Sequence, residues 1–215
     1  MEHPIQTPTL FLKSLAALTA AVALAGLGVQ LALIIQNLSA QGFSWAFAVW
    51  RYLGFFTILT NFSVAIVAAA LALQGPKLLL RPVPRLAVAT SIILVGLVYS
   101  VALRNTWQPT GWQAVADHML HDATPPLFAF TWLLSGHGQL AWRDAGKAVA
   151  PALAYFVYAL ARGRIDGWYA YWFLDPSKLP PGQMAISVGL LMAGFGLMAA
   201  LLIGLDRWLG RKAEG

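Results

Sequence analysis

The sequence predicts an all-α, polytopic membrane protein with six transmembrane helices in one domain. Of its 215 residues, 59% are hydrophobic and only 10% are charged, whereas a soluble domain keeps about a quarter of its residues charged. The mean hydropathy is +0.68, and the apolar residues gather in runs near the roughly 20 residues needed to cross a bilayer. These observations exclude a cytosolic enzyme, a disordered chain and a secreted disulfide scaffold. Because the chain has no cysteine, a thiol nucleophile and a thiolate-bound metal are excluded as well.

Six apolar runs follow one another along the chain, and each is long enough to propose as a span. The expected spans are residues 10–36, 49–73, 86–103, 116–134, 148–161 and 184–205. The fifth is short, with room to extend toward Trp168. The chain shows no internal repeat and no composition shift that marks a second domain, so residues 1–215 are expected to form a single membrane-embedded domain.

The basic residues predict the orientation of the spans. One side of the expected membrane carries nine of them: Lys13, Lys77, Arg81, Arg85, Arg143, Lys147, Arg207, Arg211 and Lys212. The other side carries five: Arg51, Arg104, Arg162, Arg164 and Lys178. By the positive-inside rule, both termini are expected in the cytoplasm of a cell-membrane protein. Since Lys and Arg fall between apolar runs, the net charge of +6 indicates the lipid bilayer as partner and not nucleic acid, and no protein partner is predicted.

The second expected span contains hydrogen-bonding side chains at membrane depth. Thr57, Asn61 and Val64 lie on one helical face, with Thr60 beside them. A threonine hydroxyl in a span often bonds its own helix backbone, so helix packing is the plain interpretation of Thr57. Asn61 needs several partners in lipid, which favours a bond between helices.

The fourth expected span begins with four titratable residues, Asp117, His118, His121 and Asp122. The spacing places Asp117 one turn from His121, and His118 one turn from Asp122. A carboxylate beside a histidine fixes its tautomer and orientation, as a general base requires. Prolines from Pro125 onward are expected to loosen the helix and to admit water. The alternative is a wet, charged helix mouth with no catalytic role.

Zinc is a second possibility for the same cluster. His118, His121 and an aspartate are suitable ligands, but a catalytic zinc normally takes three protein ligands and a water. His137 is expected about 24 Å away along the helix axis, so it cannot complete the set. We therefore expect no metal and no cofactor.

Three segments, in this order, resemble those of a known family. The first segment is Phe56-Thr57-Ile58, the second is Asp117-His118-Met119-Leu120-His121 before a proline, and the third runs from Gly167 to Asp175 in an aromatic-rich loop. Together they are similar to motifs of the androgen-induced and androgen-dependent TFPI-regulating membrane proteins and their bacterial six-span relatives. The resemblance implies an integral membrane hydrolase with a threonine nucleophile and a histidine. In animals the substrates of that family are fatty-acid esters of hydroxy fatty acids.

The resemblance also implies residue roles. Thr57 matches the nucleophile, with Thr60 as a rival one turn later, and His121 matches the catalytic histidine. On this hypothesis Asp117 orients His121, either Asn61 or backbone N–H groups near Pro125 stabilise the oxyanion, and Asp122 supports the cluster.

Candidate substrate-binding residues complete this hypothesis of a lipid ester hydrolase whose site faces the outer side. His118, Arg51 and Arg104 are candidates for a carboxylate or phosphate headgroup. Trp168, Tyr169 and Tyr171 are candidates for a lid. Two alternatives stay open: a zinc-dependent lipid hydrolase, and a non-catalytic lipid-binding or transport protein in which the cluster is a proton-coupled gate.

Overall fold

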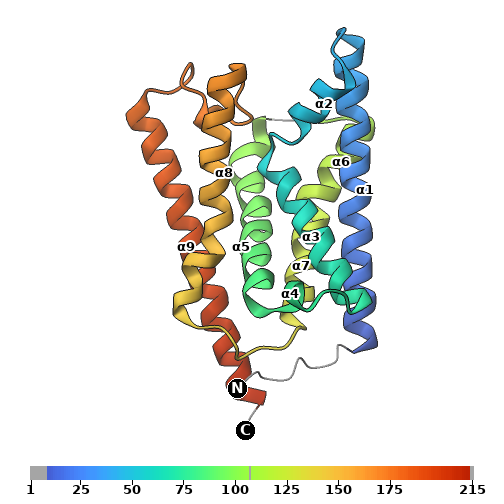
Figure 1. Ribbon diagram of the computed structural model, residues 1–215, viewed down its shortest axis with the longest axis vertical. Coiled ribbons are helices and arrows are strands. Elements are labelled where there is room, and N and C mark those ends of the chain that lie inside the picture. The colour runs from blue at the N-terminus through green and yellow to red at the C-terminus, as the bar shows by residue number, and fades with distance from the viewer. Residues whose placement is uncertain (1–8, 107, 214–215) are drawn as a thin grey trace.

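The computed structural model describes residues 9–106 and 108–213, and these residues form an α-helical bundle without strands. The α-helices are α1 (Leu10–Ala40), α2 (Trp45–Tyr52), α3 (Phe56–Leu73), α4 (Lys77–Leu80), α5 (Pro82–Val98), α6 (Gly111–His118), α7 (Thr124–Leu133), α8 (Ala145–Asp166) and α9 (Pro181–Ala213). Two π-helical turns, Tyr99–Leu103 and Met119–Ala123, and three 3-10 turns, Arg104–Thr106, Trp142–Asp144 and Trp172–Leu174, lie between them. The all-α prediction is confirmed (Figure 1).

Within the described ranges, four helices are long and apolar enough to cross a membrane. They are Leu10–Ala40, Phe56–Leu73, Pro82–Leu103 and Pro181–Lys212. Large apolar side chains are exposed on the outside of each, for example Leu24, Ile66, Leu97 and Leu197. An exterior of this kind suits a hydrocarbon solvent, as expected of a membrane protein.

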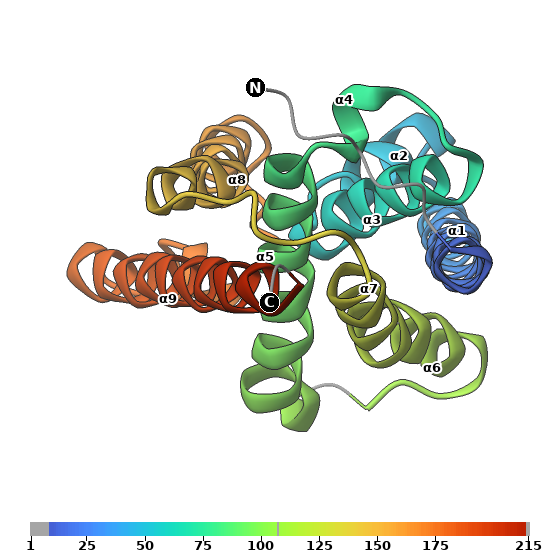
Figure 2. The same ribbon diagram turned by 90° about the horizontal axis from the view of Figure 1, so that it is seen from below.

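The long helices run alternately up and down the bundle (Figure 1). α1, α5 and α8 run in one direction, and α3, the α6–α7 pair and α9 run in the other, so the start of α1 and the end of α9 lie at the same end of the molecule. α5 packs against α3, α7, α8 and α9 and occupies the middle of the bundle (Figure 2).

The second expected span, residues 49–73, is not one continuous helix. It breaks between Tyr52 and Phe56, which leaves the short α2 and the longer α3. Gly54 lies in the break, where a Cβ atom would be 2.6 Å from the Trp168 ring and 2.8 Å from Nη1 of Arg162. Only glycine fits this space without a shift of its neighbours.

Donors from α8 stabilise the break. The hydroxyl of Tyr155 donates to the carbonyl of Gly54 (2.9 Å), and the hydroxyl of Tyr158 donates to that of Leu53 (3.2 Å). The guanidinium of Arg162 donates to the carbonyl of Trp50. Carbonyls at a helix end lack intrahelical partners, and in an apolar bundle they require others. The sequence pattern missed these long-range donors, and so it missed the break that places Thr57 in the first turn of α3.

The fourth expected span, residues 116–134, is also interrupted. α6 ends at His118, a π-turn follows over Met119–Ala123, and α7 begins at Thr124. Pro125 has no N–H to donate, so one backbone hydrogen bond of a regular helix is missing here. The π-turn accommodates this missing bond, and the hydroxyl of Thr124 donates to the carbonyl of Met119 (2.7 Å). The expected loosening near the prolines is therefore present, as a π-turn that carries His121. The fifth expected span is the longer helix α8, which reaches Asp166.

Candidate active site

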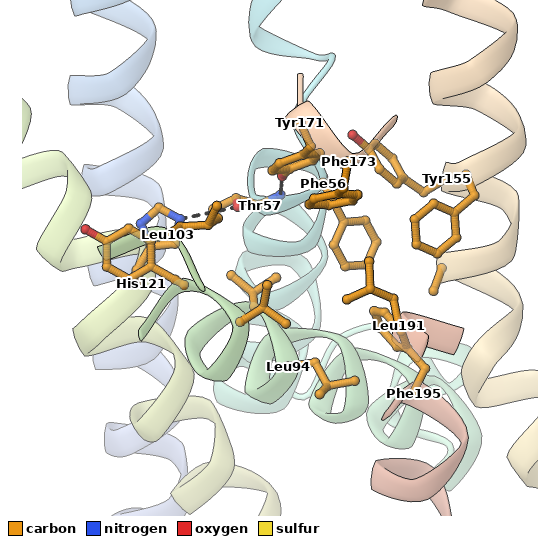
Figure 3. A pocket seen from close by; sticks show the side chains of 15 residues that line it. Phe56, Thr57, Leu94, Leu103, His121, Tyr155, Tyr171, Phe173, Leu191 and Phe195 are labelled. Carbon is orange, nitrogen blue, oxygen red and sulfur yellow. Dashed lines mark hydrogen bonds between the residues drawn. The ribbon is translucent and has the colours of Figure 1, made fainter. Parts of the chain in front are cut away.

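Thr57 and His121 meet at one end of the bundle. Oγ1 of Thr57, in the first turn of α3, lies 3.3 Å from Nε2 of His121 on the π-turn after α6 (Figure 3). Both side chains face the same cavity. Thr60, the rival position, is buried against a different cavity, and no contact joins it to His121. The geometry therefore pairs His121 with Thr57.

The other imidazole nitrogen of His121 fixes its tautomer. Nδ1 lies 3.1 Å from the backbone carbonyl of Asp117 and 3.3 Å from Oδ1 of the same residue. A carbonyl oxygen only accepts, so the proton of the neutral ring belongs on Nδ1. Nε2 is then an acceptor aimed at the hydroxyl of Thr57, which is the arrangement of a nucleophile, a base and an orienting carboxylate. The predicted pairing of Asp117 with His121 is present.

Tyr99, a residue that the sequence pattern did not single out, completes this arrangement. Its hydroxyl donates to Oδ2 of Asp117, and its ring stacks on the imidazole of His121 with centroids 4.0 Å apart and planes at 14°. Tyr99 begins the π-turn at the end of α5. Asp117 is 5% exposed, and a buried carboxylate requires such donors. Nothing local in the sequence marks Tyr99, because its partners lie on another helix.

Asn61 connects the two halves of the site instead of facing the cavity. Its Nδ2 donates to the carbonyl of Thr57 (2.9 Å) and to the carbonyl of Leu120 (3.3 Å), and its side chain is fully buried. An amide nitrogen has two hydrogens, so both are used. The bond between helices is present and fixes the turn of Thr57 against the π-turn of His121, whereas both amide hydrogens that the expected oxyanion role of Asn61 needs are already donated to carbonyls.

The cavity in front of Thr57 is mostly apolar. It contains about 540 Å³ of atom-free space, part of it open to the outside. Its lining comes from α3, α5, α8, α9 and the loop before α9: Phe56, Thr57, Leu94, Val95, Val98, Tyr99, Leu103, His121, Ala152, Tyr155, Phe156, Tyr171, Phe173, Leu191 and Phe195 (Figure 3). Thr57 and His121 lie together at one end of the cavity (Figure 3), the hydroxyls of Tyr155 and Tyr171 bond the backbone of Gly54 and Thr57, and most of the remaining wall is hydrocarbon.

Tyr171 reaches the site from the last loop, as the sequence predicted for a candidate lid residue. Its hydroxyl oxygen accepts a hydrogen bond from the backbone N–H of Thr57 (3.4 Å), and its ring stacks on Phe173 with centroids 5.2 Å apart. Burial raises the pKa of Tyr171, so the phenol stays neutral and keeps its proton. The first-turn N–H groups of α3 have no intrahelical acceptors, and they add a positive end of the helix dipole beside Thr57.

A second ionic group lies outside the cavity. Asp122 accepts from Arg104 and lies 2.6 Å from Nδ1 of His118, which is the predicted partner one turn away. His118 is exposed, and neither His118, Asp122 nor Arg104 lines the cavity. The hydrogen bond to Asp122 raises the pKa of Arg104. The structure thus separates one histidine–aspartate pair at the surface from the other pair at Thr57.

The other candidate headgroup and lid residues form a structural cluster around the break. The guanidinium of Arg51 lies 4.4 Å from the ring centroid of Trp168, and Trp168 also packs edge-on against Phe55. Tyr169 covers Gly163 of α8, where its ring would meet any Cβ atom at 2.1 Å. Arg51, Trp168 and Tyr169 are therefore not part of the cavity wall, and their expected contact with a substrate stays a prediction.

Asp166 fixes the end of this cluster. Its carboxylate accepts from the Trp168 backbone N–H (3.0 Å) and from Nε1 of Trp50 (2.8 Å), and it faces Arg162 at 3.6 Å. Burial raises the pKa of Asp166, but these hydrogen bonds and the nearby guanidinium groups outweigh it and hold the pKa below its usual value.

The described residues do not form a metal centre. No group of three or more His, Asp or Glu side chains in residues 9–106 and 108–213 is placed to hold an ion. His118 faces outward while His121 faces Thr57, so the two histidines of the zinc alternative do not converge. His137 is bonded to Asp206 (3.2 Å) and to the carbonyl of Leu133 (2.9 Å) and does not join them.

Comparison of the chain with protein-family models, with curated proteins and with solved structures finds no match.

Proposed function

We propose that this protein is an intramembrane ester hydrolase in which Thr57 is the nucleophile and His121 the general base. The observation that carries the proposal is the contact of 3.3 Å between Oγ1 of Thr57 and the acceptor nitrogen of His121, at the polar end of an apolar cavity. A threonine hydroxyl is a weak nucleophile unless a base takes its proton. The motif resemblance supports the same two roles.

The reaction proceeds in two halves. His121 takes the hydroxyl proton as Oγ1 attacks the ester carbonyl carbon, and it then gives that proton to the leaving alkoxide, which departs as an alcohol. The acyl group stays on Thr57. A water, deprotonated by His121, attacks the acyl carbon and releases the carboxylic acid, and the proton returns to Oγ1 of Thr57.

Asp117 and Tyr99 are positioning residues in this scheme. Asp117 holds Nδ1 of His121 and stabilises the imidazolium that forms after proton transfer, as the third member of a triad does. Tyr99 keeps Asp117 hydrogen-bonded and supports the ring of His121 from one face. Neither needs to touch the substrate.

The negative charge that develops on the substrate oxygen requires donors near Thr57. The Tyr171 hydroxyl accepts from the N–H of Thr57 and keeps its own proton to donate, and the other first-turn N–H groups of α3 lack intrahelical acceptors. Preorganised donors of this kind supply a large part of the stabilisation in acyl transfer. They take the place of Asn61 in the hypothesis from sequence.

The substrate class follows from the cavity. Its long apolar wall suits a fatty-acyl chain, and no charged side chain is among the described residues that line it. We propose a fatty-acyl ester as substrate, such as the fatty-acid esters of hydroxy fatty acids that the resemblance implies.

We also propose that α8 and the α6–α7 pair cross the membrane with the four long helices. Six crossings agree with the start of α1 and the end of α9 lying at one end of the bundle. The excess of basic residues at that end supports a cytoplasmic position for it, with Thr57 near the outer leaflet.

Turnover of a fluorogenic long-chain acyl ester by protein purified in detergent tests the proposal. Thr57→Val and His121→Ala should each lower turnover by at least a hundredfold, because each removes the chemistry and not only the binding. His118→Ala, a histidine one turn away that does not touch Thr57, is the matched control and should retain most activity. Equal activity of all three variants would overturn the proposal.

A further inference from the structure

A second cavity lies behind the first. It contains about 690 Å³ of atom-free space, part of it open to the outside, between α3, α5 and α8. Phe56 and Tyr155 line both cavities, and their ring centroids are 4.9 Å apart. These two rings therefore form a shared wall.

The second cavity opens sideways, at the middle of the bundle's height. Its rim includes exposed residues of α3 and α8, namely Ser63, Pro151 and Ala154, and its floor includes buried residues of α5. α3 and α8 lie on either side of α5 (Figure 2). A groove in this position faces hydrocarbon if the bundle spans a bilayer.

The floor of the groove carries a buried hydroxyl without a partner. Ser91 is 4% exposed and lines the cavity, and its Oγ makes no hydrogen bond with any described residue. In contrast, Ser63 at the rim donates to the carbonyl of Leu59 in its own helix (3.0 Å). Serine in an apolar helix normally bonds its own backbone in this way, and a buried hydroxyl without a partner is costly. The unpaired hydroxyl of Ser91 therefore points to a ligand oxygen.

We propose that the second cavity is a separate lipid-chain site, which binds an acyl chain carrying a hydroxyl or carbonyl oxygen at mid-chain. None of the described lining residues is charged, which excludes a headgroup or a free carboxylate as the buried part. The hydroxyl of Ser91 can either donate to or accept from the chain oxygen. The site does not depend on Thr57, so it stands apart from the proposed hydrolysis.

Photo-crosslinking tests this site. Octadecanoyl probes with a diazirine near mid-chain, bearing a hydroxyl, a ketone or no oxygen, are irradiated with the purified protein in nanodiscs, and the adducts are located by peptide mass spectrometry. We expect labelling of α5 near Ser91 and of α8 near Ala154, several-fold stronger for an oxygenated probe than for the plain one. The stronger of the two oxygenated probes identifies the type of oxygen.

Three variants test whether the Ser91 hydroxyl and the groove itself are responsible for the labelling. Ser91→Ala should make the oxygenated and plain probes equal, whereas Thr90→Val should leave the preference unchanged, because Thr90 has a buried unpaired hydroxyl that lines neither cavity. Ala154→Trp fills the groove from its exposed rim and should abolish labelling in protein that elutes as the parent does. Equal labelling by all three probes in the parent, or labelling that persists in Ala154→Trp, would overturn the proposal.

Discussion

The ring of Tyr99 stacks on the imidazole of His121 at 4.0 Å, while its hydroxyl donates to the carboxylate of Asp117 that holds the same imidazole. The first residue of the π-turn after α5 thus supports the candidate base in two ways, and the two can be separated by mutation.

Tyr99→Phe should lower kcat by about ten- to a hundredfold with little change in KM. The ring stays in place, but Asp117 loses a hydrogen bond to a charged group, which is worth about 1.5–3 kcal/mol, and 1.36 kcal/mol corresponds to a tenfold change in rate. Tyr99→Leu should cost more, since it also removes the stacked ring. Steady-state kinetics on the acyl ester measure both, and equal rates for Phe and Leu would mean that the stacking contributes nothing.

Asn61→Ala should lower both stability and activity. Two buried carbonyls, of Thr57 and Leu120, lose their donor, at a cost of about 1–3 kcal/mol. Thermal unfolding in detergent and ester turnover report the two effects. Ser63→Ala, which removes a bond within α3 alone, is the control; a loss as large in this variant would remove the special role of Asn61.

Gly54→Ala should destabilise the protein by about 1–3 kcal/mol, as overpacking of a filled site does. The new Cβ would meet the Trp168 ring and Arg162. Gly28→Ala is the matched control, because nothing lies within 4 Å of its Cβ position and alanine is the better helix former. Thermal unfolding of the two variants should move in opposite directions; a Gly54→Ala protein as stable as the parent would contradict the described break.

Asp166→Asn should lower the thermal midpoint at neutral pH, with a difference that disappears in acid. The folded pKa of Asp166 lies below its unfolded value, so the carboxylate contributes stability above the unfolded pKa of about 3.9, and this contribution is lost as the pH falls through the folded pKa. Unfolding midpoints of parent and variant across the acid range check the sign. A difference that grows in acid would contradict it.

The sequence pattern predicted most of what depends on local spacing. Hydropathy located the long helices, and the one-turn spacing paired Asp117 with His121 and His118 with Asp122. It did not predict the break at Gly54, because the stabilising donors come from α8, far along the chain. It did not predict the role of Tyr99 for the same reason, because the side chains that Tyr99 contacts, Asp117 and His121, lie on another segment of the chain. Charge and aromatic character favour a substrate role for Arg51, Trp168 and Tyr169, but these properties do not reveal the packing around the break that these side chains make.

The most direct test of the central claim is covalent. A long-chain acyl fluorophosphonate, which traps activated hydroxyl groups, is incubated with the purified protein, and the adduct is located by peptide mass spectrometry. The contact between Thr57 and His121 predicts phosphonylation of Thr57 that is lost in His121→Ala and kept in His118→Ala. Labelling of Thr60 instead, or no labelling of folded protein, would contradict the assignment of Thr57 as an activated nucleophile.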